Sequence, residues 1–200
     1  GLLVNLLPGF VRFNRGSADP WLAARERDGF VLAFGAFRVD GTLGTISLRY
    51  IGPGDPPAPW KKAITLKGAS TAGAAICRPD VALLAGNDSE FVRDELVLVE
   101  GGPDAVAATI LFEEAAADEA LFATWALGAI GCGAAPATLK AFAPIVRGRT
   151  VHVALDVDPA GEEWAQKAIA AAWEAGASRV TRLRPPVGKD LADLMIGRAA

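Results

Sequence analysis

The sequence predicts an α/β protein with a mostly parallel four-stranded sheet and flanking helices, preceded by a smaller antiparallel β-containing basic subdomain. In residues 95–200, short continuous apolar runs alternate with helical stretches, which is typical of parallel strands buried on both faces. In residues 1–94, apolar and polar residues alternate, as in antiparallel strands. The charges divide similarly: residues 29–78 carry six cations and two anions, whereas residues 96–200 carry nine cations and thirteen anions. We therefore expect two domains, 1–94 and 95–200.

The composition is that of a chain that can fold around its own core. Its 200 residues are 52% hydrophobic, which suffices to bury an apolar core without a disulfide or a metal staple. No apolar run reaches the roughly 18 residues of a membrane helix, and the isolated Cys77 and Cys132 do not form a zinc motif. We expect a cytoplasmic protein with free thiols and no membrane contact. Because the chain starts without Met or a basic leader, we also expect a fragment of a longer protein.

The first half predicts one hairpin and one further strand. Residues 30–34 and 45–51 alternate between apolar and polar side chains, and Asp40-Gly41 between them favours a turn. The proline-rich segment 52–59 predicts a loop, because proline removes hydrogen-bond donors and fixes φ. A short strand is expected at 62–66.

The second half predicts strands and helices in alternation, with right-handed connections between parallel strands. The helices are marked by alanine-rich or amphipathic stretches, and the strands by short apolar runs. The expected strands are 96–99, 123–127, 151–155 and 179–183, and the expected helices are 103–117, 162–175 and 190–196.

Acidic residues follow three of these strands. Glu100 follows the first, Asp156 and Asp158 follow the third, and Asp190 with Asp193 comes after the fourth. Ligands of such sheets bind at the carboxyl ends of the strands, so the acids should converge. Several carboxylates repel one another unless a cation lies between them, and oxygen ligands select Mg²⁺ or Mn²⁺. Taken alone, Asp158 before a proline would equally suit a helix N-cap without further chemistry.

The order of these motifs resembles the toprim domain of bacterial and phage primases, topoisomerases and related nucleases. The matching segments are Glu-Gly-x-x-Asp-Ala at 100–105, Asp-x-Asp-x-Ala-Gly at 156–161 and Gly-Lys-Asp-Leu-x-Asp-Leu at 188–194, within 95–197. The third segment is most similar to the toprim domains of phage and plasmid primases. The resemblance implies a catalytic role for Glu100, Asp156 and Asp158. It implies that metal ions are held by Glu100, Asp104, Asp156, Asp158 and Asp190.

The first half is similar to the basic subdomain that precedes toprim in DnaG-type primases. Residues 30–49 resemble its hairpin, and residues 60–65 resemble its Pro-Lys-Tyr-Leu-Asn-like strand, with Lys62 at the basic position. The Gly-containing segment 68–73 resembles the link that follows. Lys61 and Lys62 alternate across the strand, so only one can face the groove, and we expect Lys62 to do so. The nucleotide- and template-binding residues implied are Arg49, Lys61, Lys62 and Lys189.

The resemblance implies a DNA primase, a nucleotidyltransferase of DNA replication that makes short RNA primers from nucleoside triphosphates on single-stranded DNA with Mg²⁺ or Mn²⁺. A helicase and a template-recognition domain would lie outside this chain, which has neither a P-loop nor a zinc cluster. Two alternatives stay open: a toprim-type metal-dependent nuclease and a non-catalytic nucleic-acid-binding module. A haloacid dehalogenase phosphatase also uses Asp-x-Asp, but its motif follows the first strand, whereas here it comes late.

Overall fold

The structure is a computed structural model, and it describes most of the chain. The described residues are 11–13, 16, 18–66, 71, 73–77, 95–116 and 125–199. The expected domain boundary at 94/95 and most of the expected link at 68–73 lie outside them. Of the described helices, none combines the length and apolarity that crossing a bilayer requires.

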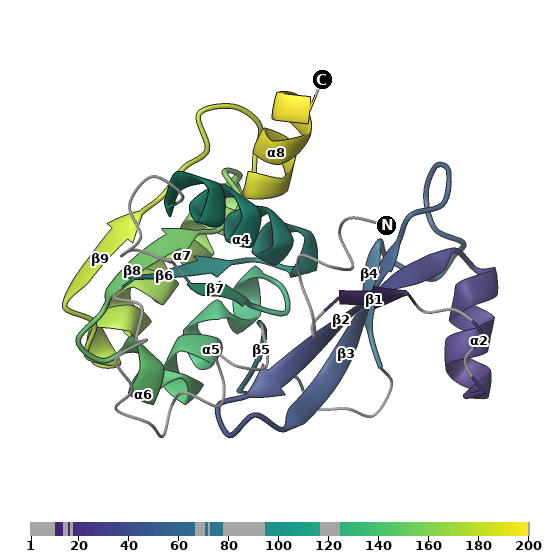
Figure 1. The fold of residues 1–200 in the computed structure, drawn as a ribbon, viewed down its shortest axis with the longest axis horizontal. Helices are drawn as coiled ribbons and strands as arrows, with labels where there is room; N and C mark the ends of the chain where they lie inside the picture. Colours follow the sequence, from purple (N-terminus) through teal and green to yellow (C-terminus); the bar gives the residue numbers. More distant parts are fainter. Residues whose placement is uncertain are drawn as a thin grey trace.

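The described part of the first half is an antiparallel sheet with one helix beside it (Figure 1). The expected hairpin is confirmed: Ala33 pairs with Leu48, and the Asp40 carboxylate holds the turn by accepting a hydrogen bond from Thr42 N at 2.9 Å. Gly41 has φ +81°, which a side chain would disfavour. The elements are β1 (Val11–Phe13), α2 (Pro20–Arg27), β2 (Phe30–Arg38), β3 (Leu43–Tyr50) and β4 (Ala63–Thr65).

The second half is the α/β unit that the sequence predicts. Its four strands lie side by side in the order β7-β6-β8-β9, and all neighbouring pairs are parallel. The strands are β6 (Glu95–Val99), β7 (Trp125–Gly128), β8 (Thr150–Ala154) and β9 (Arg179–Arg182). The helices are α4 (Gly102–Ala116), the 3-10 turn η2 (Cys132–Ala134), α5 (Ala135–Ala141), α6 (Ala143–Val146), α7 (Pro159–Glu174) and α8 (Leu191–Ala199).

One short strand, β5 (Ala74–Ile76), joins the two halves into a single sheet. It pairs antiparallel with β2 on one side and, through Ile76 and Gly128, with β7 on the other. Its three residues are buried, at 0–1% exposure. The strands of the two halves follow one another in the order β4-β3-β2-β5-β7-β6-β8-β9.

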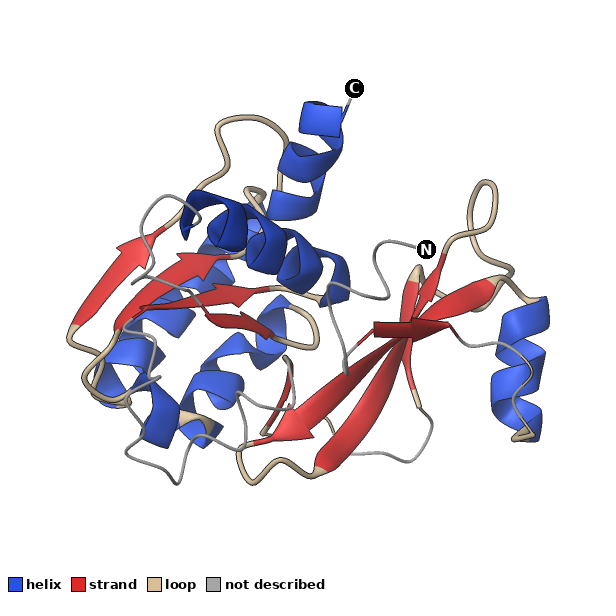
Figure 2. Ribbon diagram, in the orientation of Figure 1, coloured by secondary structure: helices blue, strands red, loops and turns tan. Residues whose placement is uncertain are grey.

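The parallel strands are covered on both faces, which explains their continuous apolar sequences. Figure 2 shows helices above and below the red strands. On one face α5, α6 and α7 contribute Leu139, Ile145 and Ala168 to a core with Leu98 of β6. On the other face α4 and α8 cover Val97 and Val99. Burial of both faces leaves few polar side chains inside the strands, and His152 of β8, which is one of them, lies 2.7 Å from Thr181 of β9.

Local differences from the sequence expectation have simple causes. Helix α7 begins at Pro159, three residues earlier than expected, because Asp158 is its N-cap and proline suits the first turn. The short helices α2, α5 and α6 were not expected, because segments of four to eight residues carry little periodicity. Strand β5 was likewise too short to identify from its sequence.

Candidate functional site

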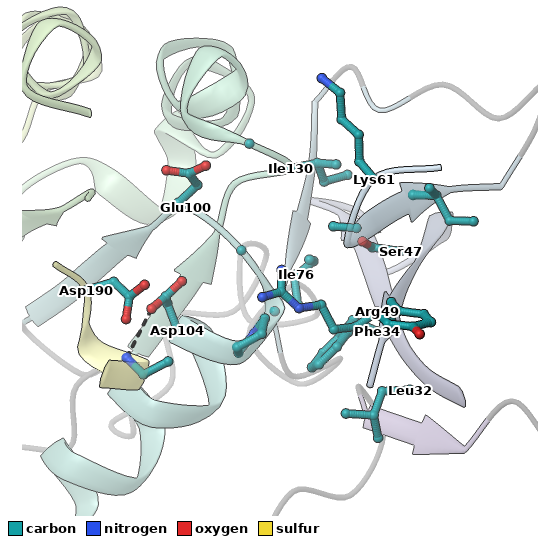
Figure 3. A pocket seen from close by; sticks show the side chains of 18 of the residues that line it. Leu32, Phe34, Ser47, Arg49, Lys61, Ile76, Glu100, Asp104, Ile130 and Asp190 are labelled. Atoms are coloured by element: carbon teal, nitrogen blue, oxygen red, sulfur yellow. Dashed lines mark hydrogen bonds between the residues drawn. The ribbon is translucent and has the colours of Figure 1, made fainter. Parts of the chain in front are cut away.

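Three aspartates converge at the carboxyl ends of the parallel strands. Oxygens of Asp104, Asp156 and Asp190 lie within 4.8 Å of one another, in positions suited to a metal ion. Asp156 follows β8, Asp104 is in the first turn of α4, and Asp190 precedes α8. Figure 3 shows Asp104 and Asp190 facing each other, with Glu100 nearby. The sequence named all four of these acids, and the structure brings them together.

The N-terminus of α8 helps to place two of these carboxylates. Asp190 Oδ1 accepts a hydrogen bond from Asp193 N at 2.7 Å, and Asp104 Oδ1 accepts one from Ala192 N at 3.1 Å. Lys189 N donates in turn to Asp193 Oδ2 at 3.1 Å. Free amides at a helix N-terminus favour negative charge, so the start of α8 is a suitable place for this cluster.

Crowding and burial raise the pKa values of two of the acids. Burial is the main cause at Glu100, followed by the charges of Asp156 and Asp104, and together with a hydrogen bond to Asp156 these raise the pKa of Glu100 to about 7. Burial, and then the charge of Asp190, raise the pKa of Asp104 to about 7. At neutral pH the protein alone therefore does not stabilise the full negative charge of the cluster.

Lys189 supplies a cation within the cluster. Its Nζ lies 2.8 Å from Asp156 Oδ2 and 3.6 Å from Asp190 Oδ2. The hydrogen bond with Asp156 is the main reason why the pKa of Lys189 is raised, so the ammonium stays charged. The sequence named Lys189 as a nucleotide ligand, and the structure places its ammonium against the acids, where it partly neutralises them.

Asp158 lies apart from the three clustered aspartates. Its side chain accepts a hydrogen bond from Gly161 N at 2.8 Å and thereby caps α7. It still acts on the same region, because Glu100, Asp156 and Asp158 all help to raise the pKa of the Cys132 thiol, after burial as the main cause. The N-cap interpretation of Asp158 therefore describes this structure, and its catalytic role stays a proposal.

A cleft of about 1110 Å³ separates the acids from the basic half. Glu100 and Asp190 line one side, and Arg49 with Lys61 line the other (Figure 3). Asp156 also lines the cleft. The two sides approach closely at Gly102, where a Cβ would lie 2.5 Å from the Phe34 ring. Because Gly102 has no side chain, Phe34 can lie directly against the loop that carries Glu100.

The structure reverses the expected orientation of the two neighbouring lysines. Lys61 lines the cleft, whereas Lys62 is absent from its lining and lies 3.8 Å from Asp55, in an exposed pair. The expectation that Lys62 faces the groove is therefore corrected. Both lysines precede β4, so the alternation of side chains that a strand would impose does not apply to them.

The acidic cluster suits a hard divalent cation. Its donors are carboxylate oxygens, which Mg²⁺, Ca²⁺ and Mn²⁺ prefer. Burial first, and then the neighbouring carboxylates, disfavour the charged forms of Glu100 and Asp104, and a bound cation would offset both effects. Asp104, Asp156 and Asp190 would hold the ion, with Glu100 beside them.

These raised pKa values predict how stability depends on pH in the metal-free protein. The ordinary pKa values are 4.5 for Glu100 and 3.8 for Asp104, so between about pH 4 and pH 7 the folded state holds protons that the unfolded chain has lost. Their contribution to stability is therefore complete below about pH 4 and lost by about pH 7. In EDTA we expect a lower Tm at about pH 8 than at about pH 5, and a smaller difference in Asp104→Asn. A wild-type Tm that rises over this range would contradict the prediction.

The structure also reveals residues that the motifs do not mark. The buried Arg182 at the end of β9 donates hydrogen bonds to Leu155 O and Asp156 O, and Glu162 of α7 binds both Arg182 and Arg184. Backbone carbonyls leave no trace in the sequence, so these contacts could not be inferred. The sequence indicates only that Glu162 lies near the start of a helix, where an acidic side chain is favoured, and it does not indicate which residues Glu162 contacts.

Comparisons with known proteins identify the fold. Residues 97–195 match the family model described as Toprim-like. The chain is similar to the primase fragment of the bacteriophage T7 primase-helicase protein, with a TM-score of 0.55 and 14% identity over 96% of this chain and 76% of that one. For the Aquifex aeolicus primase, comprising zinc-binding and RNA polymerase domains, the TM-score is 0.54 and the identity 15%, covering 83% of this chain and 36% of that one.

A third similar structure is the RNA polymerase domain of the Mycobacterium tuberculosis primase DnaG. Its TM-score is 0.51 and its identity 17%, over 82% of this chain and 50% of that one. No curated protein matches the sequence significantly. The matched segment includes the acidic cluster, and the structural likeness extends into the antiparallel half. Residues 97–195 therefore match the Toprim-like family model, and the chain has the fold of DnaG-like primase fragments.

Proposed function

We propose that the chain is the catalytic core of a DNA primase that joins nucleotides into short RNA primers on single-stranded DNA, with Mg²⁺ or Mn²⁺. The observation that carries the proposal is the cleft, in which clustered carboxylates face cationic side chains from another part of the same sheet. We also propose that the basic domain covers residues 1–94 and the toprim domain residues 95–200.

Nucleotidyl transfer needs both sides of this cleft. A bound divalent ion would stabilise the negative charge that develops on the attacking and leaving oxygens. Asp104, Asp156 and Asp190 would hold ions in place, and Glu100, which lies against Asp156, would act at the same metal centre. Arg49 and Lys61 would bind the phosphates of nucleotide or template from the opposite side.

Other parts of priming lie outside these residues. The T7 relative is a fragment of a primase-helicase protein, and the Aquifex relative includes a zinc-binding domain. By analogy we propose that a helicase and a template-recognition element act with this chain in the cytoplasm. With a net charge of −3, the chain alone would bind DNA weakly.

Primer synthesis on a single-stranded template is the direct test. The full-length protein that contains this chain would be incubated with labelled nucleoside triphosphates and Mg²⁺ or Mn²⁺. We expect short template-dependent oligonucleotides. Degradation of the template without nucleotide incorporation would instead identify a nuclease, and metal-independent DNA binding with neither reaction would identify a binding module.

Lys61 and Lys62 provide a matched pair for testing the basic side of the cleft. We expect Lys61→Ala to weaken binding of single-stranded DNA or nucleotide and to reduce the slope of log affinity against log salt by about 1, as for one lost phosphate contact. Lys62→Ala should leave both quantities nearly unchanged, because this side chain is paired with Asp55. Salt titrations of both variants measure this, and equal effects, or a larger effect at Lys62, would contradict the assignment.

A further inference from the structure

The Arg182 side chain contacts the backbone of the acidic cluster at Asp156 and is almost completely shielded from solvent. Its side chain is 8% exposed. Nη1 donates hydrogen bonds to Val153 O at 3.0 Å and Leu183 O at 2.6 Å, and Nη2 donates to Leu155 O at 2.8 Å and Asp156 O at 3.2 Å. One guanidinium therefore contacts three carbonyls in the last four residues before Val157.

These contacts begin where the sheet ends. At the ends of β8 and β9, Leu183 N donates a backbone hydrogen bond to Val153 O at 2.9 Å. Leu155 and Asp156 follow the last residue of β8, so their carbonyls lie outside the strand pairing, and Leu155 is fully buried. A buried carbonyl without a partner is costly. Arg182 donates hydrogen bonds to both carbonyls, so the backbone remains hydrogen-bonded as far as Asp156, which carries one of the clustered carboxylates.

Glu162 fixes the guanidinium from the other side. Its Oε1 lies 2.8 Å from Arg182 Nη2, and its Oε2 lies 2.9 Å from Arg184 Nη2. The two arginines lower the pKa of Glu162, chiefly through their hydrogen bonds, so it remains a carboxylate. Because Glu162 is in the first turn of α7, the start of that helix, the end of β9 and the end of β8 are joined around one side chain.

We propose that Arg182 is a positioning residue of the metal centre. By holding the backbone at Leu155 and Asp156, it sets where the Asp156 carboxylate lies relative to Asp104 and Asp190. The inference rests on the proposed function insofar as that function requires a metal ion at these acids. The planar guanidinium can serve several carbonyls and a carboxylate at once, which the ammonium of lysine cannot.

The test compares Arg182→Met and Arg182→Lys with Arg184→Met. Arg184 also binds Glu162, but it is 54% exposed and has no described hydrogen bond to these carbonyls, so it is a matched control. Binding of Mn²⁺, followed by the electron paramagnetic resonance of the free ion, is expected to weaken about 10- to 100-fold in Arg182→Met, as for lost outer-shell partners of metal ligands. The loss should be smaller in Arg182→Lys, and Arg184→Met should bind as the wild type does.

Amide hydrogen exchange provides a readout that needs no metal. Val157 N donates to Lys189 O at 2.7 Å, at the same turn. In Arg182→Met we expect faster exchange at Val157, with Val151 and Val153 inside β8 still protected. A merely structural role would instead speed exchange at all three positions.

Rescue by metal is a second readout. If the defect of Arg182→Lys lies in metal affinity, excess Mn²⁺ should restore its primer synthesis.

Each outcome decides the inference. Wild-type Mn²⁺ affinity in a folded Arg182→Met overturns it, as does unchanged exchange at Val157. If Arg182→Met does not fold, Arg182→Lys and Glu162→Gln replace it, and wild-type affinity in both overturns the inference. If the wild type itself binds no Mn²⁺, the proposed metal centre fails, and exchange at Val157 in the variants alone confirms or overturns the positioning role.

Discussion

Asp156→Asn is expected to abolish primer synthesis while leaving the protein folded. Asp156 makes the shorter of the two contacts with Lys189, at 2.8 Å, and also raises the pKa of Glu100, so it is central to the site. Loss of outer-shell partners already costs 10- to 100-fold in metal affinity or activity, and loss of a direct ligand should cost about 100-fold or more. The metal-free fold should tolerate asparagine, because removing one of several crowded charges relieves repulsion.

Primer synthesis, Mn²⁺ affinity and the Tm in EDTA together measure this effect. Asp156→Asn should lose primer synthesis and Mn²⁺ affinity and keep a Tm in EDTA close to that of the wild type. If Asp156→Asn retains wild-type turnover, Asp156 is not part of the catalytic site. A large fall in Tm without metal would show instead that the variant acts through folding.

Asp158→Asn provides the contrasting experiment at the same loop. Asparagine is as good an N-cap as aspartate, so the cap on α7 should survive while the charge is lost. Loss of turnover in this variant would therefore support the catalytic role proposed for Asp158. Full activity would show that its role is to cap the helix.

Gly161→Ala is expected to damage the metal centre as much as the loss of an outer-shell partner of a metal ligand, although Gly161 carries no side chain. A Cβ at this position would overlap the carbonyl oxygen of Asp156 and lie 2.8 Å from its carbonyl carbon. Both neighbours are backbone atoms, so either α7 or the Asp156 turn must move. The Asp158 cap would be disturbed as well, because Gly161 N is its donor. We expect Mn²⁺ affinity to fall about 10- to 100-fold, with a lower Tm.

Gly197→Ala is the matched control for this substitution. Gly197 also lies in a helix, α8, but a Cβ there would meet no atom within 4 Å, and alanine favours helix. It should leave Mn²⁺ affinity unchanged and the Tm unchanged or slightly higher. Equal Mn²⁺ affinity in Gly161→Ala and Gly197→Ala would show that the Asp156 turn accommodates a Cβ without moving its carboxylate.

The sequence was sufficient for the parallel strands and for the place of the acids. Leu96–Val99 is apolar at every position because both faces of β6 are covered, and such a continuous apolar run indicates a buried parallel strand from sequence alone. The convergence of Glu100, Asp156 and Asp190 followed from the rule that ligands bind at the carboxyl ends of parallel strands.

Contacts that depend on distant partners or on exact register were not predictable. Lys189 reaches Asp156 across 33 positions of sequence, so its place among the acids needed the fold. Arg182 binds backbone carbonyls, which every residue possesses and no sequence pattern marks. Lys61 and Lys62 both precede β4, so strand alternation could not tell which of them lines the cleft.

The strand β5 has a consequence for dividing this chain into pieces. Ala74–Ile76 covers the side of β7 that faces away from β6. A piece limited to residues 95–200 would lack β5 and leave β7 as an open edge, where another chain can add a strand and start aggregation. A stable piece that carries the toprim domain should therefore begin upstream of Ala74, so that β5 still covers the edge of β7.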